Sequence, residues 1–309
     1  MTSPAAVVRD RQKAWARSRT IEVDASGYVL ALPDNLFVPL SAASTEEYRR
    51  ADGDELGKPG KRGKMQALHS SSALACNVFE FWRARDTASL SAALGLEHPI
   101  VELEFERKFP IFSGPHAPNL DVVLTLDSGS ILAIESKFME PYAGRHSAGF
   151  GAKYFNAAAT LWADHGLDAC QALAEQIDTG TAVFHWLDAK QLLKHILGLA
   201  SQDTAWDLLY LYYDMPGPAG LEHAEEIRVF ARVTGADDIH FRAMSYQSLI
   251  SAIAPIVREP EKAYLAYLQD RYFGDLSPLE TALKTGQEQF SMSGEPAGFD
   301  VLEHLDAAE

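Results

Sequence analysis

The chain has 309 residues, of which 47% are hydrophobic, so it can bury the core of at least one large domain. Its two cysteines lie far apart in segments that look helical, which argues against a disulfide framework or a cysteine-based zinc site and favours a reducing compartment, the cytoplasm. The formal net charge of -16 argues against binding nucleic acid through bulk positive charge, and no apolar run approaches the roughly 18 residues needed to span a membrane.

Residues 1–68 contain turn-forming pieces and two groups of basic side chains, so we interpret them as an N-terminal extension with an exposed basic loop at 57–64. Each basic group has two interpretations: a solvated arm or loop, or a surface that contacts nucleic acid. The first group is Arg9, Arg11, Lys13, Arg17 and Arg19, and the second is Lys58, Lys61, Arg62 and Lys64.

The segment 70–94 opens with serines that can cap a helix, and its large apolar residues recur at near-helical spacing. This pattern predicts one long helix packed on one face. Segment 100–109 alternates strictly, which is typical of a half-buried strand with Glu102, Glu104 and Glu106 on its exposed side. Of these three, Glu104 could approach a metal ion if that face borders a cleft.

Two further strands are predicted at 120–127 and 131–138, joined by a Ser-Gly-Ser turn. After them, 185–200 carries its leucines and isoleucine on one helical stripe, and 206–214 is a continuous apolar run typical of a central strand. The predicted order is helix, three strands, helix, strand, which belongs to the α/β class.

The rest of the chain is predicted to complete the sheet and cover it. We divide the chain into the extension 1–68, a core at 69–258, and a C-terminal part at 259–309. That last part consists of one helix and an acidic tail, which from about Ser291 has a composition typical of disorder. The predicted elements are strands at 227–233 and 239–244 and helices at 245–256 and 260–273.

The paired strands 120–127 and 131–138 place charge among apolar residues. Glu135 and Lys137 must share a face, because side chains two apart on a strand point the same way. A two-residue turn would set Asp121 opposite Ser136, on the other face, whereas a three-residue loop Ser128–Ser130 with a left-handed Gly129 sets Asp121 opposite Lys137. In that register, Val122, Leu124, Leu126, Leu132 and Ile134 form the core face, and the opposite face is a surface with the charged cluster at one end.

Two carboxylates held close together repel each other unless a cation lies between them. Lys137 alone could fill that role structurally. The alternative is Mg²⁺, which prefers one or two carboxylates together with waters and phosphate oxygens. A metal ion there would favour hydrolysis of a phosphodiester, with Lys137 orienting the attacking water or offsetting the charge that develops.

The segments that carry this pattern, 118–124 and 134–138, together with 71–79 and 190–199, resemble the PD-(D/E)XK nuclease superfamily, and within it a group of uncharacterised bacterial proteins described as restriction endonucleases. The resemblance covers roughly residues 69–250. It implies a restriction-endonuclease-like core with a mixed central sheet flanked by helices, a DNA substrate, and Mg²⁺ as cofactor with Mn²⁺ as a substitute. It also implies that Asp121 and Glu135 are metal ligands and that Lys137 is catalytic. One departure is that Leu120 precedes the aspartate and the proline is displaced to Pro118.

The same resemblance suggests further site residues, each with a plainer alternative. Some branches add an acidic metal ligand from the first helix, for which Glu80 is the candidate, although a helical glutamate is more often a surface residue. Gln191 and His195 share a helix face. They resemble a downstream glutamine helix whose amide helps to shape the catalytic site, and the alternative is an ordinary polar helix face.

Two functions remain open from the sequence. The first is a Mg²⁺-dependent DNA endonuclease of restriction type, for which a homodimer is expected if both strands are cut. The second is an inactive protein with the nuclease fold that binds nucleic acid or a protein partner, which the overall acidity favours. The sequence contains no HExxH, GxSxG, GxxxxGK or strand-linked GxGxxG motif, so it offers no other catalytic class of comparable strength.

Overall fold

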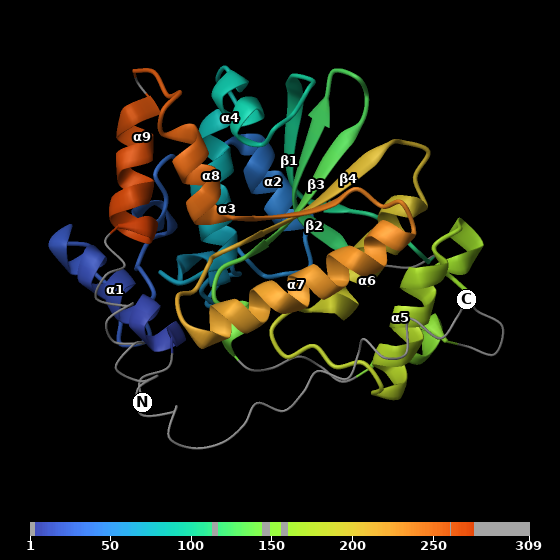
Figure 1. Ribbon diagram of the computed structural model, residues 1–309. Helices are drawn as coiled ribbons and strands as arrows, with labels where there is room; N and C mark the ends of the chain where they lie inside the picture. Colours follow the sequence, from blue (N-terminus) through green and yellow to red (C-terminus); the bar gives the residue numbers. More distant parts are fainter. Residues whose placement is uncertain (1–3, 113–116, 144–148, 156–159, 260, 275–309) are drawn as a thin grey trace.

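A five-stranded mixed sheet with helices on both faces forms the centre of the protein (Figure 1). The computed structural model describes residues 4–112, 117–143, 149–155, 160–259 and 261–274. The strand order is β1-β2-β3-β4-β5, with antiparallel pairing from β1 to β3 and parallel pairing from β3 to β5. The predicted α/β class and mixed sheet are confirmed. The strands are β1 Ile100–Lys108, β2 Asn119–Leu126, β3 Ile131–Lys137, β4 Trp206–Tyr212 and β5 Phe241–Ser245.

The predicted order of helix, three strands, helix and strand is present, but other helices differ from prediction both inside and outside the predicted core. The sequence patterns missed α1 and α5, and the strand predicted at 227–233 is wrong, because those residues lie within α7. Buried residues there recur at His223, Ile227, Phe230 and Thr234, a helical period that a short window of β-branched residues conceals. The helices are α1 Pro4–Ser18, α2 Ala42–Arg50, α3 Ser71–Phe79, α4 Ala88–Ala93, α5 Asp168–Thr179, α6 Ala189–Ala200, α7 Pro218–Ala236, α8 Tyr246–Ile253 and α9 Glu261–Leu268.

The single long helix predicted at 70–94 is two helices. Ser70 caps α3 by accepting a hydrogen bond from the backbone of Ala73, as the serine pattern suggested. Every residue from 73 to 79 is buried, so α3 is enclosed and does not lie on the sheet by one face only. A short 3₁₀ turn at 80–82 then ends it before α4 begins.

Two hydrophobic clusters lie on the two faces of the sheet. Val122, Leu124, Leu132 and Ile134 belong to the first cluster, which α3, α8 and α9 complete. Val123, Ile131 and Ala133 belong to the second, which α5, α6 and α7 complete. The predicted division of β2 and β3 into two faces is confirmed, but the expectation that the second face is a surface is wrong. Both faces are buried, as is usual where helices cover a sheet on either side.

The hairpin between β2 and β3 has a different register from the predicted one. Val122 pairs with Ile134 and Thr125 with Ile131, so Asp121 lies across from Glu135 and not from Lys137. A three-residue loop with a left-handed Gly129 is present, at φ 85°, but it spans 127–129, since the Leu126 amide bonds the Ser130 carbonyl. The shift is an even number of residues, and therefore leaves every side chain on its predicted face.

The two ends of the described chain pack together beside α3 (Figure 1). Gln12 of α1 donates to the Arg271 carbonyl at 2.7 Å, and the fully buried Arg271 guanidinium lies 4.5 Å from the ring centroid of Trp15. Residues of α1 and α9 join the same hydrophobic cluster as the sheet. Helix α1 therefore packs against the rest of the protein and is not a solvated arm.

The predicted acidic tail, from about Ser291, lies outside the described residues. Within those residues, no helix combines the length and the apolar character that crossing a membrane requires.

Candidate active site

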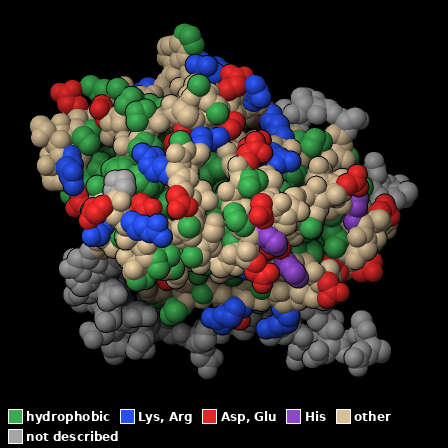
Figure 2. Space-filling model, turned by 90° about the horizontal axis from the view of Figure 1, so that it is seen from above, with side chains coloured by type: hydrophobic (Ala, Val, Ile, Leu, Met, Phe, Trp, Pro, Cys, Tyr) green, Lys and Arg blue, Asp and Glu red, His purple; other side chains and the backbone are tan. Residues whose placement is uncertain are grey.

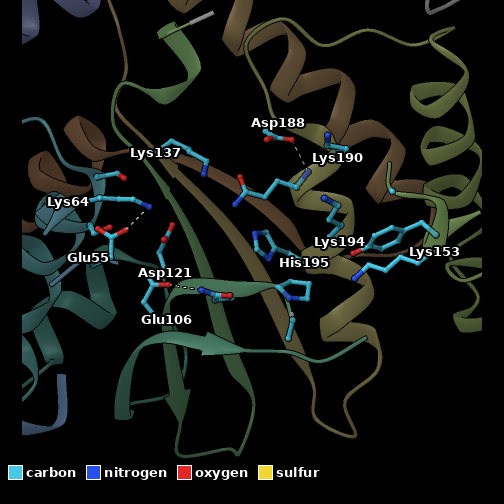
Figure 3. Close-up of a pocket in the computed structure, with 18 residues that line it drawn as sticks. Glu55, Lys64, Glu106, Asp121, Lys137, Lys153, Asp188, Lys190, Lys194 and His195 are labelled. Carbon is cyan, nitrogen blue, oxygen red and sulfur yellow. Dashed lines mark hydrogen bonds and ion pairs between the residues drawn. The ribbon is translucent and has the colours of Figure 1, made fainter. Parts of the chain in front are cut away.

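A cavity of about 770 Å³ opens where β2 begins and β3 ends (Figure 3). Asp121 from β2 and Lys137 from β3 line it, and Gln191 and His195 reach it from α6. The start of α6 is fixed by Asp188, whose carboxylate accepts a hydrogen bond from the backbone of Gln191 at 2.9 Å. Strand ends and a capped helix thus hold these four side chains on rigid elements.

Glu135 lies behind Lys137 and is 1% exposed. Lys137 Nζ donates to Glu135 Oε1 at 2.5 Å, and His195 Nε2 lies 3.0 Å from Glu135 Oε2. Asp121 Oδ2 accepts a hydrogen bond from the Ser136 backbone at 2.6 Å. The structure therefore brings together Asp121, Glu135 and Lys137, the three residues that the sequence pattern singled out, and adds His195 as a direct neighbour of Glu135.

The two carboxylates respond differently to this environment. Burial raises the pKa of Asp121 well above its usual range, and Glu135 adds to the rise against the lowering effect of Lys137. Burial alone would also raise the pKa of Glu135, but Lys137 and His195 outweigh it and hold that pKa at about 2. Glu135 is thus ionised, while Asp121 lacks sufficient positive charge nearby to ionise easily.

Lys137 remains a cation despite its burial. Burial by itself would lower the pKa of Lys137, but the carboxylates of Glu135, Asp121 and Glu140 raise it above its usual value. The side chain consequently carries a fixed positive charge at the wall of the cavity.

Glu106 is a cavity residue that the strand pattern placed on an exposed face. Its backbone has φ 54°, which a non-glycine residue rarely adopts within a strand. The alternation of β1 breaks there, because Phe105 packs in the first hydrophobic cluster and Phe109 in the second. Burial raises the pKa of Glu106 to about 7, with Asn119 opposing the rise and Glu55 and Glu135 adding to it. No sequence pattern predicts this backbone conformation at Glu106.

Glu80 is not among the residues that line the cavity, so the structure does not bring it together with Asp121 and Lys137. Its carboxylate accepts hydrogen bonds from the Ser41 backbone at 2.7 Å and from the Ser44 hydroxyl at 2.6 Å, and it pairs with Arg83 at 3.1 Å. These bonds hold the start of α2 against the end of α3. Glu104 also lies outside the cavity lining, in an ion pair with Arg107 at 3.0 Å.

The donor set of the cavity fits a hard divalent cation. Among the described residues, Glu135 Oε2 has no well-aligned hydrogen-bond donor, although it is buried. The pKa of Asp121 is high because the side chain is buried close to Glu135. A cation bound nearby would favour the ionised form of this carboxylate. Two carboxylates suffice for Mg²⁺, which keeps several waters. No group of three or more His, Cys, Asp or Glu side chains suited to a metal ion occurs in the described part of the chain.

The predicted basic loop contributes one side chain to the cavity. Lys58 and Lys61 both pair with Asp54, at 2.6 and 2.8 Å, and Arg62 pairs with Asp24. Lys64 lines the cavity with its Nζ 3.8 Å from a Glu55 carboxylate oxygen. Most of this basic loop is therefore neutralised by its own neighbours.

Comparison with known proteins gives one match. Residues 9–273 match the model of a family described as restriction endonuclease associating with ARP. No curated protein and no solved structure matches the chain. The matched range includes most of α1, the five strands β1 to β5, and all the cavity residues named above.

Proposed function

The chain belongs to the family described as restriction endonuclease associating with ARP, and on that premise we propose that it is a Mg²⁺-dependent endonuclease that hydrolyses phosphodiester bonds in DNA. One observation carries the proposal: Asp121 and Lys137 line a single cavity, with the buried Glu135 bonded directly behind the lysine. The family supports a nuclease and a restriction-endonuclease-like fold. The metal and the residue roles are our inference from the geometry.

Asp121 and Glu135 are the residues that would hold Mg²⁺, or Mn²⁺ in its place. When bound, such a cation polarises the scissile phosphate and lowers the pKa of a coordinated water. The protein's own contribution is to fix both carboxylates, through the Ser136 amide on Asp121 and through Lys137 and His195 on Glu135. His195 acts here as a positioning residue.

Lys137 acts as a hydrogen-bond donor and a positive charge, because its raised pKa prevents it from accepting a proton from water. Its Nζ keeps further N–H groups beyond the one that bonds Glu135. These groups can stabilise the negative charge that develops on the phosphate oxygens in the transition state. Gln191, at the rim of the same cavity, has an amide that can donate to the phosphate or to the attacking water.

The second candidate is an inactive member of the fold that binds nucleic acid or a protein partner. It is favoured by the small number of metal-binding side chains, since the described residues contain no cluster of three acidic, histidine or cysteine ligands. In that case the contact between Lys137 and Glu135 neutralises a buried carboxylate and does nothing more.

Incubation of the purified protein with supercoiled plasmid separates the two candidates. We expect nicked or linear product with Mg²⁺ or Mn²⁺ and none in EDTA, because the protein's side chains lack the charge to activate water unaided. Linear product without a nicked intermediate would indicate two sites acting together, as in a homodimer. Undiminished cleavage in EDTA would contradict the metal, and a lack of product with either cation would leave the inactive alternative.

A further inference from the structure

Charge is divided unevenly between the two sides of the cavity. Figure 3 shows Glu55, Glu106 and Asp121 on one side and Lys153, Lys190 and Lys194 on the other. The three lysines come from two elements, a 3₁₀ turn at 152–154 and the first two turns of α6. We call Lys153, Lys190 and Lys194 the lysine wall.

Two members of the lysine wall are not neutralised by carboxylates. Neither Lys153 nor Lys194 forms an ion pair with any residue that the structure describes. Their ammonium groups lie instead 5.4 and 5.6 Å from the ring centroid of one tyrosine, Tyr154. Contact with an aromatic ring attracts a cation but leaves its charge in place. Both charges therefore remain available to an anion in the cavity.

Repulsion among the lysines of the wall and the dipole of α6 both favour an anion between these lysines. Burial lowers the pKa of Lys194, and Lys190 and Lys153 lower it further, although Asp188 opposes them. An anion between these groups would remove that repulsion. The N-terminal turn of α6 adds the positive end of a helix dipole on the same side.

Among the described residues, the opposite end of the sheet has a different distribution of charge. The end that carries the turn between β2 and β3 displays acidic and basic side chains interspersed with one another (Figure 2). With a net charge of -16, the protein must hold a nucleic acid through local basic residues.

We propose that Lys153 and Lys194 bind a backbone phosphate of the DNA strand whose cleavage is assigned to Asp121, Glu135 and Lys137. This inference rests on the proposed function and adds the path of the strand, which runs from the carboxylates to the lysine wall. An ammonium group binds phosphate as a compact point charge and does not read a base, so the contact is independent of sequence. The Tyr154 ring lies within 5.6 Å of both ammonium groups.

The test is a double variant, Lys153→Ala with Lys194→Ala, whose binding to a short labelled DNA duplex is measured in EDTA over a range of KCl concentrations. Loss of the contact with this one phosphate should reduce the slope of log K against log salt by about 0.9. Affinity should fall at least tenfold at low salt. In the cleavage assay, KM should rise more than kcat falls, because the contact is present before and during reaction.

Two control variants make the result specific. Lys153→Arg with Lys194→Arg keeps both charges and should restore most of the affinity. Lys262→Ala removes an exposed lysine that pairs with Glu259 at 2.7 Å, away from the cavity, and should bind DNA as the unaltered protein does. Melting temperature shows whether each variant is folded. If the alanine pair is not folded, the single variants Lys153→Ala and Lys194→Ala decide the matter through the same salt slope.

If the alanine variant cleaves DNA with an unchanged salt slope and KM, the proposed phosphate contact of the lysine wall is wrong, but the proposed nuclease function is not affected. If the unaltered protein does not cut DNA but its salt slope depends on these lysines, the proposed nuclease function is wrong and DNA binding by the lysine wall is supported. Equal loss with the Lys262→Ala control would mean that the effect is one of net charge only.

Discussion

Charged side chains at the two ends of strands β2 and β3 are stabilised in different ways. At the turn end, His98 pairs with Asp127 at 3.1 Å and His240 with Asp207 at 3.2 Å, and all four side chains are at least 37% exposed. At the cavity end, Glu135 is 1% exposed and contacts Lys137 and His195 directly. Water screens the first pairs, so each contributes little, whereas the buried groups depend on one another.

This difference indicates which end of the strands can support chemistry. Substitution of an exposed pair changes stability little. The buried carboxylates at the cavity, in contrast, are stable only because specific donors and cations surround them. Substitutions at the two ends should consequently differ by orders of magnitude in their effect on function.

The largest effect is expected at Lys137. Lys137→Ala should lower kcat by about 10²–10³-fold, because a donor to the transition state is removed. It should also lower the free energy of unfolding without metal by roughly 3–5 kcal/mol, since Glu135 loses its buried partner. Single-turnover cleavage and chemical denaturation in EDTA measure the two effects.

Lys137→Arg is the matched control, because it keeps a cation against Glu135 with a different geometry. We expect it to recover stability but little of the rate. For comparison, Asp121→Ala should lose Mg²⁺ affinity and cleavage together. Cleavage by Lys137→Ala at the rate of the unaltered protein would contradict the catalytic assignment.

At Glu106 we expect an effect of intermediate size, on the dependence of the free energy of unfolding on pH. Its pKa rises from 4.5 in the unfolded chain to about 7 in the folded protein, so the folded state binds more protons between those values. The contribution of this group to stability is therefore fully present below pH 4.5 and is lost as pH rises through 7. Glu106→Gln removes this contribution, and should give a free energy of unfolding that declines less across that window.

Urea denaturation at a series of pH values, without divalent metal, measures this slope. Glu102→Gln is a suitable control, because Glu102 is exposed on the same strand. Identical slopes for the unaltered protein and Glu106→Gln would mean that the Glu106 carboxyl is not protonated at neutral pH in the folded state.

The smallest effect is expected at the turn end. His240→Ala removes an exposed pair with Asp207 and should change the free energy of unfolding by less than about 0.5 kcal/mol. DNA cleavage should be unchanged, because the residue does not line the cavity. A loss of cleavage comparable to that of Lys137→Ala would remove the distinction between the two ends.

The sequence predicted the central residues of the candidate site because their charges interrupt apolar strands. Asp121, Glu135 and Lys137 stand out against valine, leucine and isoleucine, and strand periodicity places them on one face. The register was missed by two residues. In three-residue hairpin loops the left-handed residue is commonly the third, so Gly129 marks a loop at 127–129, as the structure has it.

Other features depend on tertiary structure that local patterns do not report. The left-handed backbone of Glu106 reverses the facing of β1 at a residue type that gives no warning. The lysine wall had a partial signal, since Lys190 and Lys194 are four apart on the helix that carries Gln191. Lys153 joins them only through folding. Glu80 is an acidic residue at the end of the first core helix, as a metal ligand from that helix would be. Its carboxylate, however, accepts hydrogen bonds from Ser41 and Ser44 and does not line the cavity.

The packing of α1 against the short π-helix Gln269–Phe273, which follows α9, has a consequence for synthesis of the protein. Gln12 and Arg271 are 259 positions apart, yet Gln12 donates to the Arg271 carbonyl, and apolar residues of the same two segments belong to the first hydrophobic cluster. A ribosome that has made the whole sheet has not yet released the segment that covers Trp15. Because contacts between distant parts of a chain form late, an interrupted chain would expose this cluster to aggregation. Completion of the first hydrophobic cluster thus waits for residues 261–273 to emerge.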